Sequence, residues 1–416
     1  MNLNLTINSE SLDLAASQLW SFLSPELNYL PSQKKNIVYK AFQQMVLAHN
    51  LQRRKGGDFY ITHPVQACHT LAQMKMDSDT LSACLLHDVP EDTDCSLDNL
   101  GKIFNPEIIF LVSGVTKLSI IKYQQNDIYA KNLRRLFIAM SQDLRVILIK
   151  LADRIHNLST LNALPPEKAK RIALESLEIY VPIAKRLGIH WLSRMIEELA
   201  FEYAYPEENK QINLDLNNKL LSKNAQAKQI IQETITTASK NQFKIAEIIK
   251  KNKTLYSIFK NTGKSVLKTT QQEDIINTTF VTKNISDCLL LLNILKSSKS
   301  LIVSDLKNHI TEAGTASFKG LRIKIKLKDE LQNSSNQEIE AEIQIRTSSM
   351  QLFHSFGMAL LWSHKLIPLS QKKVIAGDLA KINISWLNQL VSLGHEELDQ
   401  DKYLEQLVSN LNYFSS

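Results

Sequence analysis

Hydrophobic and polar residues follow a helical period through the first half of the chain. Apolar positions recur three and four residues apart in KKNIVYKAFQQMVLAH, in LRRLFIAMSQDLRVILIKLADRIHNL and in KRIALESLEIYVPIAKRLGI, which is the pattern of amphipathic helices. Glycine and proline lie between such stretches, at Gly56-Gly57, Pro106 and Pro165-Pro166, where they favour breaks. The pattern predicts successive helices throughout this half.

The pattern changes near Tyr205-Pro206. A polar helix is predicted over LLSKNAQAKQIIQETITTASKNQ. Further on, LRIKIKL from Leu321 and EAEIQIRT from Glu340 alternate apolar with charged residues, as half-exposed strands do. The segment KDELQNSSNQE between them is predicted to be a turn or loop, and the tail from about Gln371 is again helical.

We therefore predict a mainly α protein with three parts. They are a helical domain at residues 1–205, an α+β domain at residues 206–370 and a C-terminal helical segment at residues 371–416. The length agrees, because 416 residues exceed the roughly 250–300 residues at which a single core stops growing.

Composition narrows the class of protein. No apolar run approaches the roughly 18–20 residues of a membrane span, and MNLNLTINSESLDLAAS at the start does not read as a secretory signal. Four cysteines without a CxxC pair indicate reduced thiols, so we expect a cytoplasmic protein without a membrane partner. The net charge of +7 fits a polyanionic ligand, but lysine runs are usually solvated, and we do not expect nucleic acid as a partner. The sequence carries no signal for an oligomeric state.

The stretch LSACLLHDVPEDTD contains the first candidate chemistry. His87 and Asp88 directly follow an apolar run, and more carboxylates follow them. Imidazole and carboxylate together suit manganese, iron or zinc rather than calcium. His63, just before a proline that can start a helix, and Asp153, within the long apolar run VILIKLADRIHNL, are the further candidate ligands. The conjunction of these four residues in one helical domain favours a metal site.

Each candidate ligand also has a structural interpretation. His63 could cap a helix or lie in the core, and Asp153 could form a salt bridge with Arg154 or Arg145. Spacing alone also leaves two other histidines open as ligands, His69 and His156.

Acidic and basic residues lie close to the candidate ligands in the sequence. Glu91 and Asp92 follow the His-Asp pair and could accept a proton from an activated water, or be solvent-facing acids at a helix end. Arg53, Arg54 and Lys55 precede a double glycine and could bind phosphate or stack on a base, although an ordinary basic loop has the same composition.

These motifs resemble the hydrolase domain of the RelA/SpoT family, proteins of the HD superfamily that make and destroy the alarmones ppGpp and pppGpp. The resemblance covers roughly Lys34 to Tyr205 and includes RRKGGDFYITHPVQACHTLAQM, TLSACLLHDVPEDTD, GVTKL and AMSQDLRVILIKLADRIHNLSTL. It implies a manganese (Mn2+) site formed by His63, His87, Asp88 and Asp153. It implies catalytic roles for Glu91 and Asp92, and nucleotide contacts by Arg54, Lys55, Asn157 and Thr160. Ser159 departs from the arginine that the family commonly has at this position.

The second half resembles the family's synthetase domain with its functional residues eroded. LYSIFK, EDIIN around Asp274 and EIQIRTSSM around Glu342 match family elements. The family's polar residues are replaced at several positions, namely Thr279 for arginine, Phe318 for tyrosine, Arg322 for histidine and Ser355 for glutamate. The resemblance therefore implies a nucleotidyltransferase-like α+β domain that is retained as a pseudo-synthetase.

The predicted function is manganese-dependent hydrolysis of the 3′-pyrophosphate of (p)ppGpp to GDP or GTP and pyrophosphate. The synthetase-like domain is predicted to be catalytically inactive and structural or regulatory. The alternatives are a bifunctional enzyme with weak synthesis, an HD phosphohydrolase acting on another 3′-phosphorylated nucleotide, and a non-catalytic regulator that binds guanine nucleotides.

Overall fold

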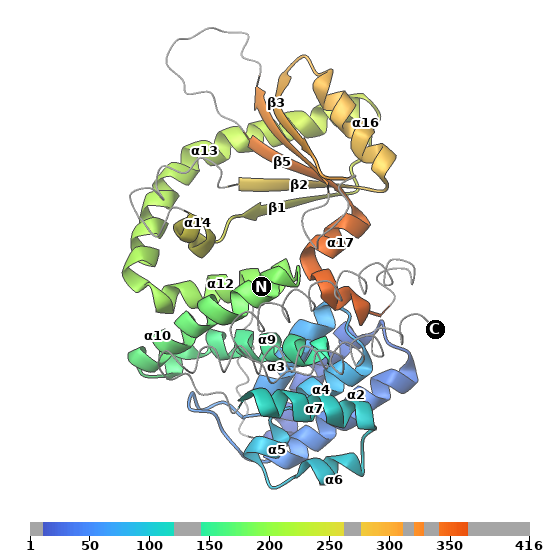
Figure 1. The fold of residues 1–416 in the computed structure, drawn as a ribbon, viewed down its shortest axis with the longest axis vertical. Coiled ribbons are helices and arrows are strands. Elements are labelled where there is room, and N and C mark those ends of the chain that lie inside the picture. Colours follow the sequence, from blue (N-terminus) through green and yellow to red (C-terminus); the bar gives the residue numbers. More distant parts are fainter. Residues whose placement is uncertain (1–10, 120–142, 262–275, 311–319, 328–340, 365–416) are drawn as a thin grey trace, which may run out of the picture. The chain divides into compact units, whose positions relative to one another are not determined.

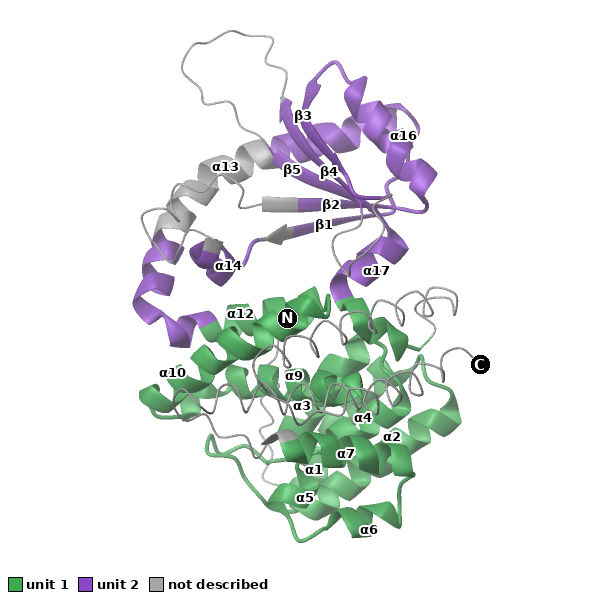
Figure 2. Cartoon of the chain, viewed as in Figure 1, with its two compact units in different colours: residues 1–200, 356–416 green, residues 201–355 purple. Residues whose placement is uncertain are grey.

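The computed structural model describes residues 11–119, 143–261, 276–310, 320–327 and 341–364 (Figure 1). The chain forms two compact units, one of residues 1–200 with 356–416 and one of residues 201–355 (Figure 2). The predicted loop KDELQNSSNQE and the predicted helical tail from Gln371 lie outside the described residues.

The first unit is helical over its described residues, as the sequence predicts. Its elements are α1 (Leu12–Leu23), η1 (Ser24–Leu27), α2 (Ser32–His49), α3 (Thr62–Gln73), α4 (Ser78–Leu86), α5 (Val89–Asp92), α6 (Leu97–Gly101), α7 (Pro106–Ser119), α9 (Leu144–Ser159), η2 (Leu161–Ala163), α10 (Pro166–Glu175), the π-helical η3 (Ser176–Tyr180), α11 (Val181–Arg186) and α12 (His190–Ala204). Helices α3, α4 and α9 pack on one another in its interior.

Helix α4 is buried on all sides because its sequence is small as well as apolar. Ser82, Ala83 and Cys84 are fully buried together with the leucines around them, so neighbouring helices approach it closely from every direction. Asp77 begins the helix by accepting hydrogen bonds from the backbone N–H groups of Asp79 and Thr80. A helix placed this way delivers its C-terminal residues to the interior of the unit.

Helix α9 begins later than the apolar pattern suggests. Asp143 has an extended backbone, and its carboxylate accepts a hydrogen bond from the N–H of Arg145. This cap starts the helix at Leu144. The predicted helical run from Leu133 is therefore interrupted at Asp143, and its part before that residue lies outside the described residues.

Residues Phe356–His364, here called the return segment, follow α17 (Ser348–Phe356) and belong to the first unit. The 3-10 helix η4 (Gly357–Leu361) is buried along its whole length. Its Met358 N–H donates to the carbonyl of Leu187 at 3.0 Å. Gly357 has φ 49°, and a Cβ at this position would overlap the Leu187 carbonyl oxygen and the Gly188 backbone. Only glycine fits here.

The end of the return segment meets the start of α4. The N–H of Asp77 donates to the Trp362 carbonyl at 3.1 Å, and the N–H of His364 donates to the Lys75 carbonyl at 2.7 Å. The guanidinium of Arg145 lies 5.8 Å from the centre of the Trp362 ring. The segment thus contacts the first residues of α4 and α9.

Over its described residues, the second unit contains a five-stranded sheet with order β1-β2-β5-β4-β3 and the helices around it. The elements are α13 (Pro206–Lys240), β1 (Glu247–Asn252), α14 (Leu255–Asn261), β2 (Ile276–Thr282), α16 (Ile285–Lys296), β3 (Leu301–Asn308), β4 (Leu321–Leu327) and β5 (Ala341–Thr347). Strands β2 and β5 are parallel and the other neighbours antiparallel. The predicted strands are confirmed as β4 and β5. Strand β4 is half-exposed as predicted, and its Leu321, Ile323 and Ile325 point into a core shared with α13 and α16. Strand β5 is not half-exposed, because Ile343–Thr347 are all buried.

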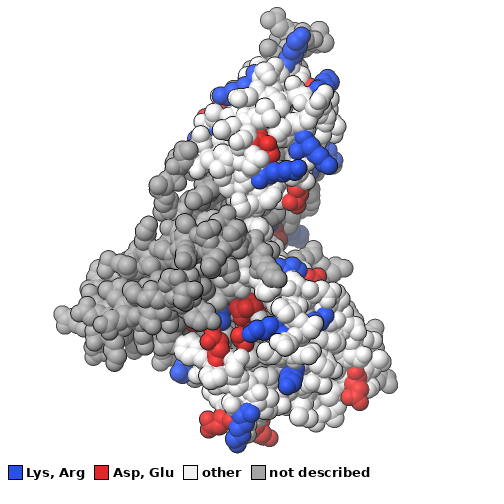
Figure 3. Space-filling model, turned by 90° about the vertical axis from the view of Figure 1, so that its right-hand side faces the viewer, with Lys and Arg blue, Asp and Glu red and all other residues white. Residues whose placement is uncertain are grey.

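Charges are mixed on the one face of the molecule that Figure 3 draws. On the face drawn in Figure 3, lysine and arginine side chains lie among aspartates and glutamates rather than in one basic field. None of the helices in the described ranges is both long and apolar enough to span a bilayer.

Candidate metal centre and the residues around it

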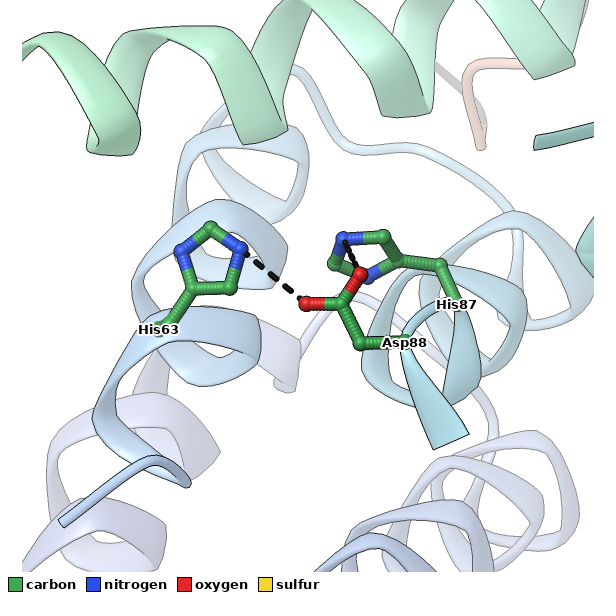
Figure 4. Close-up of side chains that lie close together, drawn as sticks. All are labelled: His63, His87 and Asp88. Carbon is green, nitrogen blue, oxygen red and sulfur yellow. Dashed lines mark ion pairs between the residues drawn. The ribbon is translucent and has the colours of Figure 1, made fainter. Parts of the chain in front are cut away.

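The four predicted ligands lie together in the first unit. His63 is in the first turn of α3, His87 and Asp88 join α4 to α5, and Asp153 is in α9. The Nε2 atom of His63 is 3.3 Å from Asp88 Oδ2 and 3.1 Å from Asp153 Oδ1. His87 Nε2 is 3.1 Å from Asp88 Oδ1 and 3.9 Å from Asp153 Oδ1. Figure 4 shows the Asp88 carboxylate between the two imidazoles.

A break between two helices makes this arrangement. Helix α4 ends at Leu86, and Asp88 takes the N-cap position of α5, which has Pro90 as its second residue. Proline cannot donate a backbone hydrogen bond to a continuing helix but is tolerated in a first turn. The turn therefore brings two consecutive side chains, His87 and Asp88, to the same side as His63.

Hydrogen bonds fix which nitrogen of each imidazole is available. His87 Nδ1 is 2.7 Å from the Cys84 carbonyl oxygen, so it must carry the hydrogen. His87 Nε2 is then a bare lone pair, and it is buried without a hydrogen-bond partner among the described residues. His63 Nδ1 is 2.8 Å from His156 Nδ1, and its Nε2 also faces the carboxylates. Two lone pairs and two carboxylates directed at one another fit a divalent ion.

The electrostatics of the cluster favour a cation. Burial works to raise the pKa of Asp153, but the Lys150 ammonium and the His63 imidazole hold that pKa well below its usual range. Burial also works to raise the pKa of Asp88, yet His87 and His63 hold it below its usual range. Burial works to lower the pKa of His63, and its contacts with the two carboxylates raise it overall. Both carboxylates therefore stay ionised, which is the state in which a carboxylate binds a metal ion.

The alternative pairings of Asp153 do not form. Arg154 pairs with Glu175 at 2.7 Å, and Arg145 binds Asp143 and Glu107. The Asp153 carboxylate instead accepts from Lys150 Nζ at 2.7 Å. Of the two histidines left open, His69 stacks on the ring of Phe22 with centroids 4.3 Å apart, whereas His156 contacts His63 through its Nδ1.

The acidic pair Glu91 and Asp92 is exposed on α5, beside the candidate ligands. Tyr60 connects this helix to the centre, because its hydroxyl lies 2.5 Å from Asp92 Oδ2 and 2.8 Å from Asp88 Oδ2. Burial and the two carboxylates raise the pKa of Tyr60, so the phenol keeps its proton and donates it. Tyr60 was not among the residues predicted from the sequence, where its one signal is its place three residues before His63.

The basic loop also reaches the centre. It is closed by hydrogen bonds from the Arg54 N–H to the Asp58 carbonyl and from the Gly57 N–H to the Arg54 carbonyl, both 2.9 Å. Arg54 Nη2 donates to Asn157 Oδ1 at 2.8 Å, while Lys55 is exposed. Asn157 Nδ2 in turn donates to Asp153 Oδ1 at 2.5 Å.

Two more residues of interest lie at the end of α9. The Thr160 hydroxyl is 3.3 Å from the carbonyls of His156 and Asn157. Ser159, the departure from the family pattern, donates to the His156 carbonyl at 2.8 Å. Of the predicted nucleotide contacts, Arg54 and Asn157 are thus neighbours of each other, Asn157 contacts the predicted ligand Asp153, and Thr160 contacts the backbone of Asn157.

In the second unit, the structure shows the surroundings of Glu342, which matches an acidic residue of the family's synthetase domain. Glu342 in β5 lies with Oε1 3.5 Å from Arg322 Nε of the neighbouring strand and accepts from Gln344 Nε2 at 3.3 Å. Thr279 is buried in β2, paired in register with Gln344. The Ser355 hydroxyl accepts from Gln351 Nε2 at 3.3 Å. Asp274 and Phe318 lie outside the described residues.

Comparisons with known proteins identify both parts of the chain. A family profile described as "HD domain" matches residues 41–190, and one described as "Region found in RelA / SpoT proteins" matches residues 250–366. A GTP pyrophosphokinase of Myxococcus xanthus is 31% identical over 92% of this chain and 49% of its own. A guanosine-3′,5′-bis(diphosphate) 3′-pyrophosphohydrolase of Borreliella burgdorferi is 33% identical over 86% of this chain and 52% of its own. The bifunctional (p)ppGpp synthase/hydrolase SpoT of Escherichia coli is 33% identical over 92% of this chain and 53% of its own length.

The chain spans about half the length of these curated relatives. The candidate centre lies inside the first matched region, and the second matched region contains strands β2 to β5 and the end of β1. An HD domain followed by a RelA/SpoT region, with relatives of this kind along most of its length, makes this protein a member of the RelA/SpoT-homologue family.

Proposed function

We propose that the helical unit is a manganese-dependent hydrolase that removes the 3′-pyrophosphate of ppGpp or pppGpp, leaving GDP or GTP. The observation that carries this proposal is the convergence of two imidazole Nε2 atoms on the carboxylates of Asp88 and Asp153. The names of the relatives, a 3′-pyrophosphohydrolase among them, support the substrate.

The donor set supports the choice of metal. Imidazole nitrogen with carboxylate oxygen suits manganese, iron or zinc, and the family resemblance favours manganese. His63, His87, Asp88 and Asp153 would hold the ion. Such an ion supplies Lewis-acid chemistry, lowering the pKa of water and stabilising charge on phosphorus-bound oxygen.

The chain's own residues would then bind substrate and move protons. Arg54 and Lys55 offer cationic donors to the phosphates and guanine. Glu91 and Asp92 accept the proton as water oxygen attacks the 3′-linked phosphorus, with Tyr60 holding Asp92 in place. The bond from that phosphorus to the 3′ oxygen breaks, the 3′ oxygen takes up a proton, and pyrophosphate leaves.

We further infer that the second unit no longer synthesises the alarmone. Glu342 matches the family's catalytic strand, yet its carboxylate faces the guanidinium of Arg322 at 3.5 Å. To bind magnesium, the Glu342 carboxylate would need to be accessible to the ion, and the Arg322 side chain beside it opposes the approach of a second cation. Thr279, in place of an arginine, cannot supply charge to a phosphate.

The proposal is tested by assaying the full chain with ppGpp over a manganese titration, with and without chelator. We expect chelator-sensitive release of pyrophosphate, and loss of both turnover and bound manganese in Asp88→Asn and His87→Ala while circular dichroism stays unchanged. Stoichiometric metal in these variants contradicts the four-ligand assignment. Assays with a panel of other 3′-phosphorylated nucleotides test the alternative, in which the protein hydrolyses one of them in preference to ppGpp. Binding of guanine nucleotide without turnover would identify a non-catalytic regulator.

A further inference from the structure

The guanidinium of Arg54 is the branch point of two hydrogen-bonded chains. Its Nη1 lies 2.9 Å from Nδ1 of His156, and its Nη2 donates to Oδ1 of Asn157 at 2.8 Å. Both partners are in α9, within one turn of Asp153. A guanidinium donates and never accepts, so the two partner atoms must both be acceptors.

The first branch leads to His63. Because His156 Nδ1 accepts from Arg54, it carries no hydrogen. It is 2.8 Å from His63 Nδ1, so the hydrogen between these rings belongs to His63, and the single lone pair of His156 Nδ1 is shared by the Arg54 and His63 donors. The Nε2 lone pair of His63 is thereby left for an ion, 3.1 Å from Asp153 Oδ1. Burial, then His63 and Arg54, keeps the pKa of His156 well below its usual range, as a neutral acceptor requires.

The second branch leads to Asp153. Asn157 presents its oxygen to Arg54, which turns its Nδ2 toward Asp153, 2.5 Å from Oδ1. A half-turn of the amide would place oxygen against carboxylate oxygen, and the Arg54 donor prevents this. Lys150 holds the other carboxylate oxygen at 2.7 Å. One guanidinium thus sets the orientation of two predicted ligands.

We propose that Arg54 is a positioning residue of the metal centre, acting on His63 through His156 and on Asp153 through Asn157, besides its expected contact with nucleotide. This inference rests on the proposed metal-dependent function. Loss of Arg54 then weakens metal binding with no nucleotide present. Simple electrostatics predicts the opposite sign, because removing a positive charge near the centre strengthens cation binding.

The experiment measures the manganese dissociation constant of the full chain without nucleotide, by electron paramagnetic resonance of free Mn2+. Arg54→Gln is compared with Lys55→Gln, which removes the same charge from an exposed side chain of the same loop. We expect affinity to fall roughly 10–100-fold in Arg54→Gln, the usual effect of losing a residue that orients ligands. Lys55→Gln should stay at or slightly above the wild-type affinity.

A second pair isolates the histidine. His156→Asn keeps an acceptor where Nδ1 stood, and His156→Leu removes it, so the asparagine variant should retain affinity that the leucine variant loses. Circular dichroism and thermal melting establish that the variants are folded. Unchanged or tighter binding in Arg54→Gln overturns the relay. If that variant does not fold, equal affinities in the two folded His156 variants overturn it. A wild-type chain that binds no manganese overturns the proposed function on which the relay rests.

Discussion

At the scale of single residues, the acidic pair beside the centre is separated from the ligands by its exposure. Glu91 and Asp92 are exposed, whereas the ligand candidates His63, His87 and Asp153 are buried. Substituting the pair should therefore change proton transfer without changing the cluster that holds the ion.

Glu91→Gln combined with Asp92→Asn should lower turnover roughly 10²–10⁴-fold, the range for general acid–base groups. Bound manganese and nucleotide affinity should persist, as measured by metal analysis and equilibrium binding. Asp94→Asn is the control, because Asp94 is another exposed acid of the same stretch and should leave turnover unchanged. Near-normal turnover in the double variant would return the pair to a surface role.

His49 gives the unit a pH dependence. Burial lowers its pKa despite the Gln52 side chain 2.7 Å from Nδ1, and Nε2 is buried without a hydrogen-bond partner in the described part of the chain. Below about pH 6.5, the ordinary value for histidine, the unfolded chain binds this proton and the folded chain resists it. The free energy of unfolding therefore falls as the pH falls through this range, by at most about 1.4 kcal/mol per pH unit.

His49→Phe keeps a flat ring against Tyr60, whose centroid is 4.4 Å away, and removes the titration. Denaturant melts from pH 7 to pH 5 in chelator should show a shallower decline for this variant than for the wild type. Parallel declines would exclude His49 as a source of the acid sensitivity.

The sequence alone could identify site residues whose side chain is unusual for its position, such as a charged residue in an apolar run. His87-Asp88 after an apolar run and Asp153 within one could be selected on that ground. The partners Tyr60 and Lys150 could not, because a tyrosine and a lysine are ordinary at such positions. Their roles arise from tertiary contacts, as does that of His156, which meets His63 across 93 positions of sequence.

At the scale of elements, periodicity predicted the amphipathic helices of the first unit and the strand β4, because these elements bury one face on a core. The strand β5 was also predicted, although Ile343–Thr347 are buried on both faces. Periodicity did not predict the start of α9, which a capping aspartate decides. Nor did it show where the return segment packs. The apolar sequence GMALL indicates that these residues are buried, but it does not indicate which helices they contact.

Gly357→Ala should displace the return segment. A non-glycine residue in the left-handed region costs roughly 1–2 kcal/mol, and the added Cβ also overlaps the Leu187 carbonyl. We expect faster hydrogen exchange at the Met358 amide, which donates to that carbonyl, and a lower melting temperature. Gly101→Ala is the matched control, because a Cβ there meets nothing within 4 Å. Equal exchange in both variants would contradict the account of Gly357.

At the scale of the whole molecule, the second unit is expected to be inactive as a synthetase. The part of the chain after Tyr205 is nevertheless expected to be needed for the stability of the first unit. Synthesis needs two nucleotides held around magnesium, and losses at several contacts of one site combine to abolish activity even though each contact alone is worth a few kcal/mol. Incubation with labelled ATP and GDP should give no ppGpp above background. Any product formed at a rate above a no-enzyme control refutes the inference that this unit is inactive.

Truncation after Tyr205 removes the return segment as well as the sheet. Burial of Met358, Leu360 and Leu361 stabilises the first unit by roughly 1.5–3 kcal/mol per side chain at most, which is a large share of a domain's stability. The fragment should therefore melt earlier and hydrolyse more slowly. Rejoining residues 356–416 to residue 204 through about 15 Gly/Ser residues, which span roughly 20 Å, should restore both. A short fragment as stable and active as the full chain would contradict this.

Because the first unit is discontinuous in sequence, the order of synthesis on the ribosome constrains when it can be completed. Residues 201–355 are translated between its two parts, and at about 5–20 residues per second this takes roughly ten to thirty seconds. During that interval the nascent helices lack Met358–Leu361, and the surface these residues later bury stays open to chaperones and to neighbouring chains. The first unit is therefore completed last although most of it is made first, and a ribosome that stalls within the sheet-forming stretch leaves this unit without its return segment.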